Sequence, residues 1–117
     1  MYYLSKTFEI SVAHQLRTCY DTRCKNLHGH NAIVTVFCAT EQLNADGMVV
    51  DFKKIKDVIM GQLDHSYLND VVEFNPTAEN MSRWICEQIP NCYKVVFQES
   101  AGNIAAYVRP GFENVNF

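Results

Sequence analysis

Two stretches near the start of the chain alternate apolar and polar residues with the period of a β-strand. In residues 6–14 one face carries Phe8, Ile10, Val12 and His14, and the other carries Glu9 and Ser11. Because successive side chains of a strand point to opposite sides, this alternation predicts a half-buried strand. A second β-rich run follows at residues 28–41, after a polar loop at residues 16–26. The sequence NADG at residues 44–47 then predicts a hairpin turn into a further extended segment, residues 48–50.

The period changes to that of an α-helix after Asp51. One helix face carries Phe52, Ile55, Val58, Ile59 and Leu63. This spacing predicts an amphipathic helix that ends between Gly61 and Leu63. A second helix is predicted after Pro76, with Thr77 as its N-cap and Glu79 near the positive end of the helix dipole. Its expected buried stripe is Met81, Trp84, Ile85 and Ile89, and Pro90 ends it.

The last two predicted strands, residues 93–98 and 104–108, pair across a turn at residues 100–103. The element order is therefore β, β, helix, helix, β, β. This order predicts an α+β fold in which a four-stranded antiparallel sheet carries both helices on one face. A chain of 117 residues, 48% of them apolar, is long enough for one core, so we expect a single domain over residues 1–117.

Composition excludes several classes of partner. The formal net charge is only -3, so no broad basic face is expected to bind nucleic acid or an acidic membrane surface. No run of eighteen apolar residues predicts a membrane span, and the first ten residues lack the pattern of a secretion signal. Five cysteines, an odd number, favour reduced thiols over a disulfide framework. We therefore expect a cytoplasmic protein.

Three histidines are the candidate metal ligands. His28 and His30 are two residues apart at the start of a strand, so their side chains point to the same side, about 7 Å apart. Gly29 between them allows another backbone to approach closely. His14 ends the inner face of the preceding strand and reaches the same point if the two strands are neighbours. Three imidazoles that leave one position open are typical of a catalytic zinc site.

Each of these residues also has a plainer interpretation. A histidine such as His14 is most often a surface or core residue, and an HxH pair also occurs without metal. Cys24 is a possible fourth zinc ligand, but structural zinc sites seldom combine a cysteine with three histidines. We therefore interpret Cys24 as a reactive thiol, with Arg23, Lys25 and the ion favouring its thiolate form. Cys19, Cys38, Cys86 and Cys92 are interpreted as inert.

Two further groups stay open on the residues alone. Asp64 can orient the imidazole of His65 if a turn brings their side chains together, but the segment LDHSYLND also fits a polar loop after a helix. Glu99 enters a turn after an apolar strand face. If it faces inward, its carboxylate needs a partner and suits paired N–H donors of a ligand; if it faces water, it is ordinary.

Six motifs together resemble the 6-pyruvoyltetrahydropterin synthase superfamily. They are SVAHQL, CKNLHGHN, MVVDF, LDHSYLN, NPTAEN and QES, in this order over nearly the whole chain. The spacing from Cys24 to His30 is similar to that of the bacterial 6-carboxy-5,6,7,8-tetrahydropterin synthase branch of queuosine biosynthesis. The 6-pyruvoyl enzymes have their cysteine two residues earlier, where this chain has Thr22. Ser100 after Glu99 departs from the threonine of many members.

The resemblance implies zinc bound by His14, His28 and His30, with Cys24 as the catalytic base. It also implies that Asp64 and His65 form a proton-transfer pair and that Glu99 anchors the pterin. The implied architecture is the tunnelling fold, in which a homohexamer forms active sites at subunit interfaces.

The implied reaction is that of a lyase, which converts 7,8-dihydroneopterin triphosphate into 6-carboxy-5,6,7,8-tetrahydropterin, acetaldehyde and triphosphate. Arg17, Arg23 and Lys25 are candidates for binding the triphosphate, although a solvated loop explains them equally well. The alternatives are a 6-pyruvoyltetrahydropterin synthase, which releases no acetaldehyde, a zinc-stabilised binding module without catalysis, and a pterin aldolase that acts on unphosphorylated dihydroneopterin.

Overall fold

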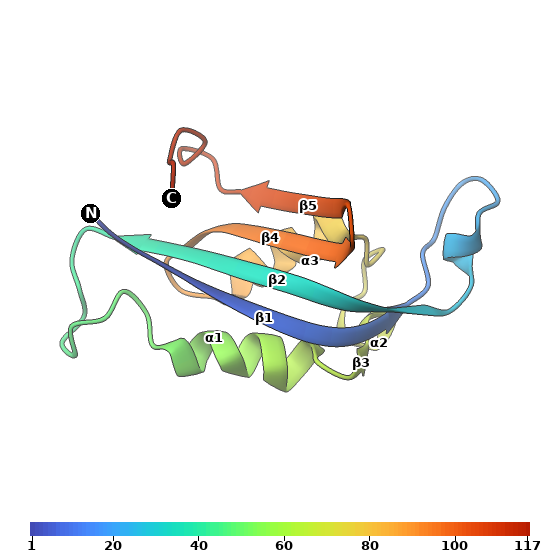
Figure 1. Cartoon of the computed structure of the whole chain (residues 1–117), viewed down its shortest axis with the longest axis horizontal. Helices are drawn as coiled ribbons and strands as arrows, with labels where there is room; N and C mark the ends of the chain where they lie inside the picture. Colours follow the sequence, from blue (N-terminus) through green and yellow to red (C-terminus); the bar gives the residue numbers. More distant parts are fainter.

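Two long antiparallel strands form the centre of the structure. β1 (Tyr2–His14) and β2 (His28–Thr40) pair along their whole length, from Tyr2 opposite Thr40 to His14 opposite His28. The computed structural model describes residues 1–117. β4 (Cys92–Ser100) pairs with β2, and β5 (Asn103–Val108) pairs with β4 (Figure 1). These four strands are antiparallel, as predicted.

A fifth strand corrects the predicted four-stranded sheet. β3 (Ser66–Tyr67) pairs in parallel with Val12 and Ala13, so the strand order is β3-β1-β2-β4-β5. A strand of two residues is too short to give a period in the sequence, which is why the pattern missed it. The hairpin after residue 47 was also predicted wrongly. The Asn44 side chain accepts hydrogen bonds from the N–H groups of Asp46 and Met48 and closes a turn, but no strand follows.

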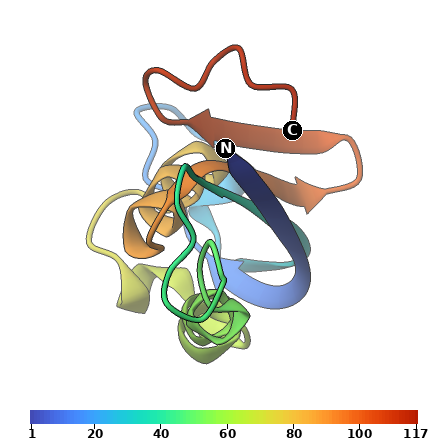
Figure 2. The same cartoon turned by 90° about the vertical axis from the view of Figure 1, so that its left-hand side faces the viewer.

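Two longer helices cover one face of the sheet, as predicted (Figures 1 and 2). The first is α1 (Phe52–Val58), which continues as a π-helical segment, η2 (Ile59–Leu63). The second is α3 (Ala78–Gln88), where the Thr77 side chain accepts a hydrogen bond from the N–H of Asn80 and so forms the predicted cap. A single turn, α2 (Leu68–Val71), lies between them in the chain.

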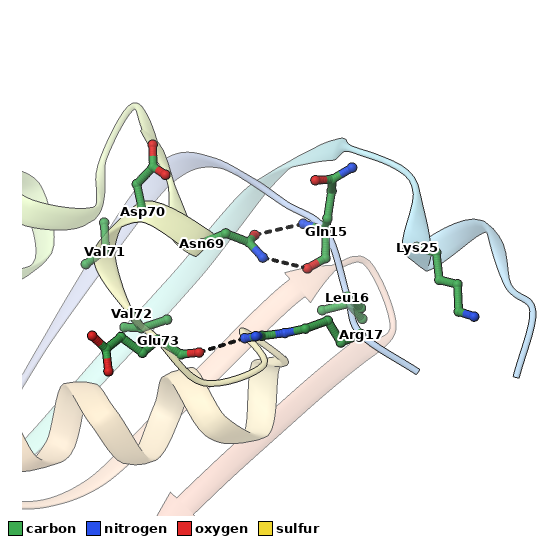
Figure 3. A pocket seen from close by; sticks show the side chains of 9 residues that line it. All are labelled: Gln15, Leu16, Arg17, Lys25, Asn69, Asp70, Val71, Val72 and Glu73. Carbon is green, nitrogen blue, oxygen red and sulfur yellow. Dashed lines mark hydrogen bonds between the residues drawn. The ribbon is translucent and has the colours of Figure 1, made fainter. Parts of the chain in front are cut away.

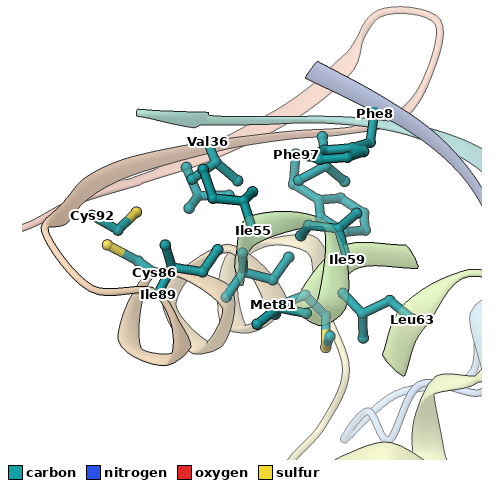
Figure 4. Packing of buried hydrophobic residues seen from close by; sticks show 14 of the residues in the cluster. Phe8, Val36, Ile55, Ile59, Leu63, Met81, Cys86, Ile89, Cys92 and Phe97 are labelled. Atoms are coloured by element: carbon teal, nitrogen blue, oxygen red, sulfur yellow. The ribbon is translucent and has the colours of Figure 1, made fainter. Parts of the chain in front are cut away.

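The core lies between the sheet and the two helices (Figure 4). The sheet contributes the predicted inner positions of β1 and alternate residues of β2. The helices contribute most of their predicted stripes. The buried residues include Phe8, Ile10, Val12, Ala32, Val34, Val36, Cys38, Ile55, Val58, Ile59, Leu63, Met81, Ile85 and Ile89. Trp84 is only partly buried, and Phe52, the first residue of α1, is 51% exposed and lies outside the core. Burial of these apolar side chains is the main stabilising contribution to the fold.

All five cysteines are free thiols, as expected for a chain without a disulfide framework. Cys38, Cys86 and Cys92 are buried in the core. Hydrogen bonding to Cys38, together with burial, raises the pKa of Cys92 to about 12, which keeps this thiol protonated. None of the helices combines the length and apolar character needed to cross a membrane.

Candidate metal centre and active site

The ends of β1 and β2 bring the three predicted histidines together. His14 is opposite His28 in the antiparallel ladder, and His30 is opposite Val12. All three side chains are on the inner face, and their ring centroids are 4.5 to 5.1 Å apart. A Cβ atom at Gly29 would lie 3.3 Å from the carbonyl oxygen of Val12, so glycine suits the close approach expected there.

Backbone carbonyls hold two of the rings in orientation. Nδ1 of His14 lies 2.8 Å from the Pro76 carbonyl, and Nδ1 of His28 lies 2.7 Å from the Asn26 carbonyl. When Nδ1 donates to a carbonyl, the neutral ring keeps an unprotonated Nε2 that can bind a metal. Burial lowers the pKa of His14 below its ordinary value, which favours this neutral form.

A fourth side chain, Glu99 of β4, joins the cluster. The ligand atoms of His14, His28, His30 and Glu99 all lie within 4.8 Å of one another. Nε2 of His30 is 2.8 Å from Oε1 of Glu99, but the oxygen is not in the direction in which this nitrogen forms a hydrogen bond. Nε2 of His14 is likewise buried without a partner. Two unpaired buried nitrogens are costly, so the group fits a metal ion, which would satisfy both.

Cys24 lies beside this cluster but is not one of its four potential ligands. It is half-buried in a 3₁₀ turn, η1 (Arg23–Lys25), which the Thr22 side chain caps. The Cys24 carbonyl accepts a hydrogen bond from the N–H of Leu16, so the turn is tied to the end of β1. A cavity of about 330 Å³ is lined by Arg23, Cys24, His28, His30, Glu99, Ser100 and Asn103. Cys24 therefore lines the same space as His28 and His30.

Glu99 also lines a second cavity, of about 410 Å³, together with Glu79 and Asn103. The two cavities share the lining residues Glu99 and Asn103 and are therefore neighbours in the candidate site. The sequence pattern did not predict Asn103 in the site, and it predicted Glu79 only near the positive end of the helix dipole. The position of Glu79 in NPTAEN, in the first turn of α3, was the available sequence signal. Glu79 lines the second cavity together with residues of β5.

The side chains of Asp64 and His65 meet, which is the condition under which Asp64 can orient the imidazole. Oδ2 of Asp64 lies 3.0 Å from Nδ1 of His65, and the backbone of Ser11 on β1 holds both residues. The N–H of Ser11 donates to Oδ1 of Asp64, and the N–H of His65 donates to the Ser11 carbonyl. His65 has a φ of 59°, a left-handed conformation that is uncommon for residues other than glycine and is often found at functional sites.

The pair does not join the metal cluster within one chain. No hydrogen bond or ion pair links them, and Ser11 precedes His14 by three residues, about 10 Å along the strand. The His65 side chain is 80% exposed and points away from the core. The outward position of His65 makes it available to a surface outside its own chain.

The largest cavity, about 640 Å³, lies next to the Cys24 turn (Figure 3). It contains the predicted triphosphate candidates Arg17 and Lys25, and Arg23 lines the cavity at the metal cluster instead. The Arg17 guanidinium donates to the Glu73 carbonyl, and Lys25 lies 3.6 Å from Asp21. Asp70 and Glu73 also line this cavity, so it is not a simple anion site.

Comparison with known proteins decides the family. The model of the 6-pyruvoyl tetrahydropterin synthase family matches residues 3–110. The chain belongs to this family. It is 32% identical to the 6-carboxy-5,6,7,8-tetrahydropterin synthase of Synechocystis sp., a match that covers 94% of this chain and 95% of that protein. It is 27% identical to the protein of the same name from Bacillus subtilis, with 89% of this chain and 83% of that protein covered.

The family likeness extends to three-dimensional structure. The structure of the 6-pyruvoyl tetrahydropterin synthase of Caenorhabditis elegans superposes on this chain with a TM-score of 0.71 at 26% identity. The match covers 92% of this chain and 94% of the Caenorhabditis elegans chain. This confirms the tunnelling fold implied by the sequence motifs, with five strands in place of four.

The Asp64 carboxylate gives a pH-dependent prediction. The N–H of Ser11 and then His65 hold the pKa of Asp64 below its usual range, so the folded state favours the ionised form. This stabilisation is full above the unfolded pKa of about 3.9 and is lost as the pH falls through the folded value. We expect metal-free Asp64→Asn to melt at a lower temperature than the unmodified protein at pH 7. The two melting temperatures should converge on acidification below pH 4; a constant difference would contradict the assignment.

Proposed function

We propose that this protein is a zinc-dependent 6-carboxy-5,6,7,8-tetrahydropterin synthase, which converts 7,8-dihydroneopterin triphosphate into 6-carboxytetrahydropterin, acetaldehyde and triphosphate. The observation that carries the proposal is the shared cavity of Cys24, His28, His30 and Glu99. It unites a thiol and a metal-binding group in a chain that resembles proteins of this name over nearly its whole length.

His14, His28 and His30 are the proposed zinc ligands. Imidazole nitrogens suit zinc, and Nε2 of His14 and of His30 form no hydrogen bond within the chain. Zinc held by these residues would act as a Lewis acid. It would lower the pKa of the side-chain hydroxyl groups of the substrate and stabilise negative charge next to them. The protein contributes the fixed ring orientations set by the Pro76 and Asn26 carbonyls.

Cys24 is the proposed catalytic base. In the proposed reaction its thiolate takes a proton from the side chain of a substrate bound in the cavity that Cys24 lines with His28 and His30. His65 gives or receives the second proton, while Asp64 fixes its ring through Nδ1. Because His65 faces outward from its own chain, we propose that this pair acts on the active site of a neighbouring subunit.

Open strand edges support assembly with other copies. β1 pairs with β3 only at Val12 and Ala13, and β5 has a neighbour on one side only. Unpaired edges of this length favour addition of further strands. A homohexamer built from such sheets is the assembly that the family resemblance implies, and its proposed location is the cytoplasm.

Glu99 is the proposed pterin anchor, since its carboxylate can accept hydrogen bonds from the amino group and ring nitrogen of a pterin. We expect Glu99→Gln to weaken pterin binding at least about tenfold and to change zinc affinity much less, as measured by calorimetry of both ligands. Glu79→Gln is the matched comparison, because Glu79 lines the same second cavity. If pterin affinity falls with Glu79→Gln and not with Glu99→Gln, the anchor is Glu79.

Product analysis tests the reaction itself. Purified zinc-loaded protein is incubated with 7,8-dihydroneopterin triphosphate, and the products are identified by mass spectrometry. Acetaldehyde and 6-carboxytetrahydropterin support the proposal, and a 6-pyruvoyl product without acetaldehyde replaces it with the other family activity. Equal turnover of unphosphorylated dihydroneopterin would indicate an aldolase. No turnover, with unfolding on chelation, would indicate a binding module.

A further inference from the structure

Two asparagine side chains take the place of a strand beside the segment that follows His14. Asn69 accepts a hydrogen bond from the N–H of Gln15 and donates one to the Gln15 carbonyl, both 2.9 Å long (Figure 3). Asn75 makes the same pair of bonds with Arg17, at 2.8 and 2.7 Å. Each carboxamide therefore satisfies both backbone groups of one residue, as a neighbouring strand would.

The two asparagines differ in what their own backbone does. Asn75 immediately precedes Pro76, the residue whose carbonyl accepts the hydrogen bond from Nδ1 of His14. The Asn75 carbonyl is itself held, by the N–H of Thr77 and by the side chain of Asn80. Asn69, by contrast, lies in α2, and no residue next to it contacts a histidine ring through a hydrogen bond.

The Asn75 side chain thus provides a second link between the end of β1 and the loop that carries the Pro76 carbonyl. One link is the His14 side chain to Pro76, and the other is the Arg17 backbone to the Asn75 side chain. Two links this close leave the carbonyl little freedom to move relative to the His14 ring. The carbonyl in turn sets the tautomer and the direction of Nε2.

We propose that Asn75 is a positioning residue for the metal centre: it holds the Pro76 carbonyl against His14 and thereby orients Nε2 of His14 toward the metal. The proposal rests on the proposed metal site and is independent of which pterin reaction occurs there. Loss of a group that orients a ligand in this way typically weakens metal binding by about tenfold to a hundredfold.

The test compares Asn75→Ala with Asn69→Ala. Zinc affinity is measured by competition with a chromophoric chelator, and the stability of the metal-free forms by urea unfolding. Both variants lose the same kind of paired bond, so both should be destabilised. Only Asn75→Ala should bind zinc about tenfold to a hundredfold more weakly, and only its cobalt-substituted form should show shifted visible absorption bands.

Two results would overturn the proposal. Equal loss of zinc affinity in both variants would make the asparagines simple tethers of the strand end, and unchanged affinity in Asn75→Ala would remove any link to His14. If Asn75→Ala does not fold, Asn75→Asp serves instead, because it keeps the acceptor for the Arg17 N–H and loses only the donor; weaker zinc binding is again expected. Failure of the unmodified protein to bind zinc would count against the metal site itself.

Discussion

Cys24→Ala is expected to lower kcat by at least about a hundredfold while the protein retains stoichiometric zinc. The thiol lies in the cavity of His28, His30 and Glu99 but outside the four-residue group that can hold a metal. Its removal should therefore take away a proton acceptor and leave the ligands intact. Turnover is measured with saturating substrate, and metal content by atomic emission.

Cys19→Ala is the matched control for this experiment. Cys19 is an exposed thiol in the same loop and lines none of the cavities at the metal cluster. It should retain full activity and zinc. Stoichiometric loss of metal in Cys24→Ala would instead make Cys24 a ligand, and near-normal kcat would remove it from the chemistry.

The sequence was sufficient for those parts of the fold that repeat with a regular period. Alternation over residues 6–14 and 28–41 located β1 and β2, and because these strands pair as neighbours, the three histidines on their inner face had to converge. The motifs then supplied the family. The metal group was therefore predictable from spacing together with strand pairing.

The features that the sequence did not reveal depend on tertiary contacts without a period. β3 pairs with β1 next to the point where Asp64 and His65 form hydrogen bonds with the backbone of Ser11, and His65 is in a left-handed conformation there. The valines at 49 and 50 are consecutive and both buried, and Asn91 donates to the Val49 carbonyl; these contacts replace the predicted hairpin strand. Glu99 could not be oriented until the pairing of β4 with β2 was known.

Subunit mixing gives the sharpest test of where His65 acts. Cys24→Ala and His65→Ala should each be inactive alone, because each lacks one of the two proposed proton-transfer groups. If Cys24 and His65 of one active site come from different chains, random co-assembly of equal amounts of the two variants restores about one quarter of the sites. If both come from one chain, every site lacks one group and no activity returns.

A second mixture provides the control for this result. Cys24 and Glu99 line the same cavity of one chain, so no co-assembly of Cys24→Ala with Glu99→Gln contains a site with both groups intact. This mixture should show only the residual activities of its components. Recovery in the first mixture and not in the second would follow from the geometry of the single chain, in which Ser11 holds the Asp64 and His65 pair at the edge of β1 and leaves the His65 ring exposed. Equal recovery in both mixtures would contradict this assignment of the groups to chains. Exchange of whole subunits cannot bring an intact Cys24 and an intact Glu99 into one cavity if a single chain forms that cavity.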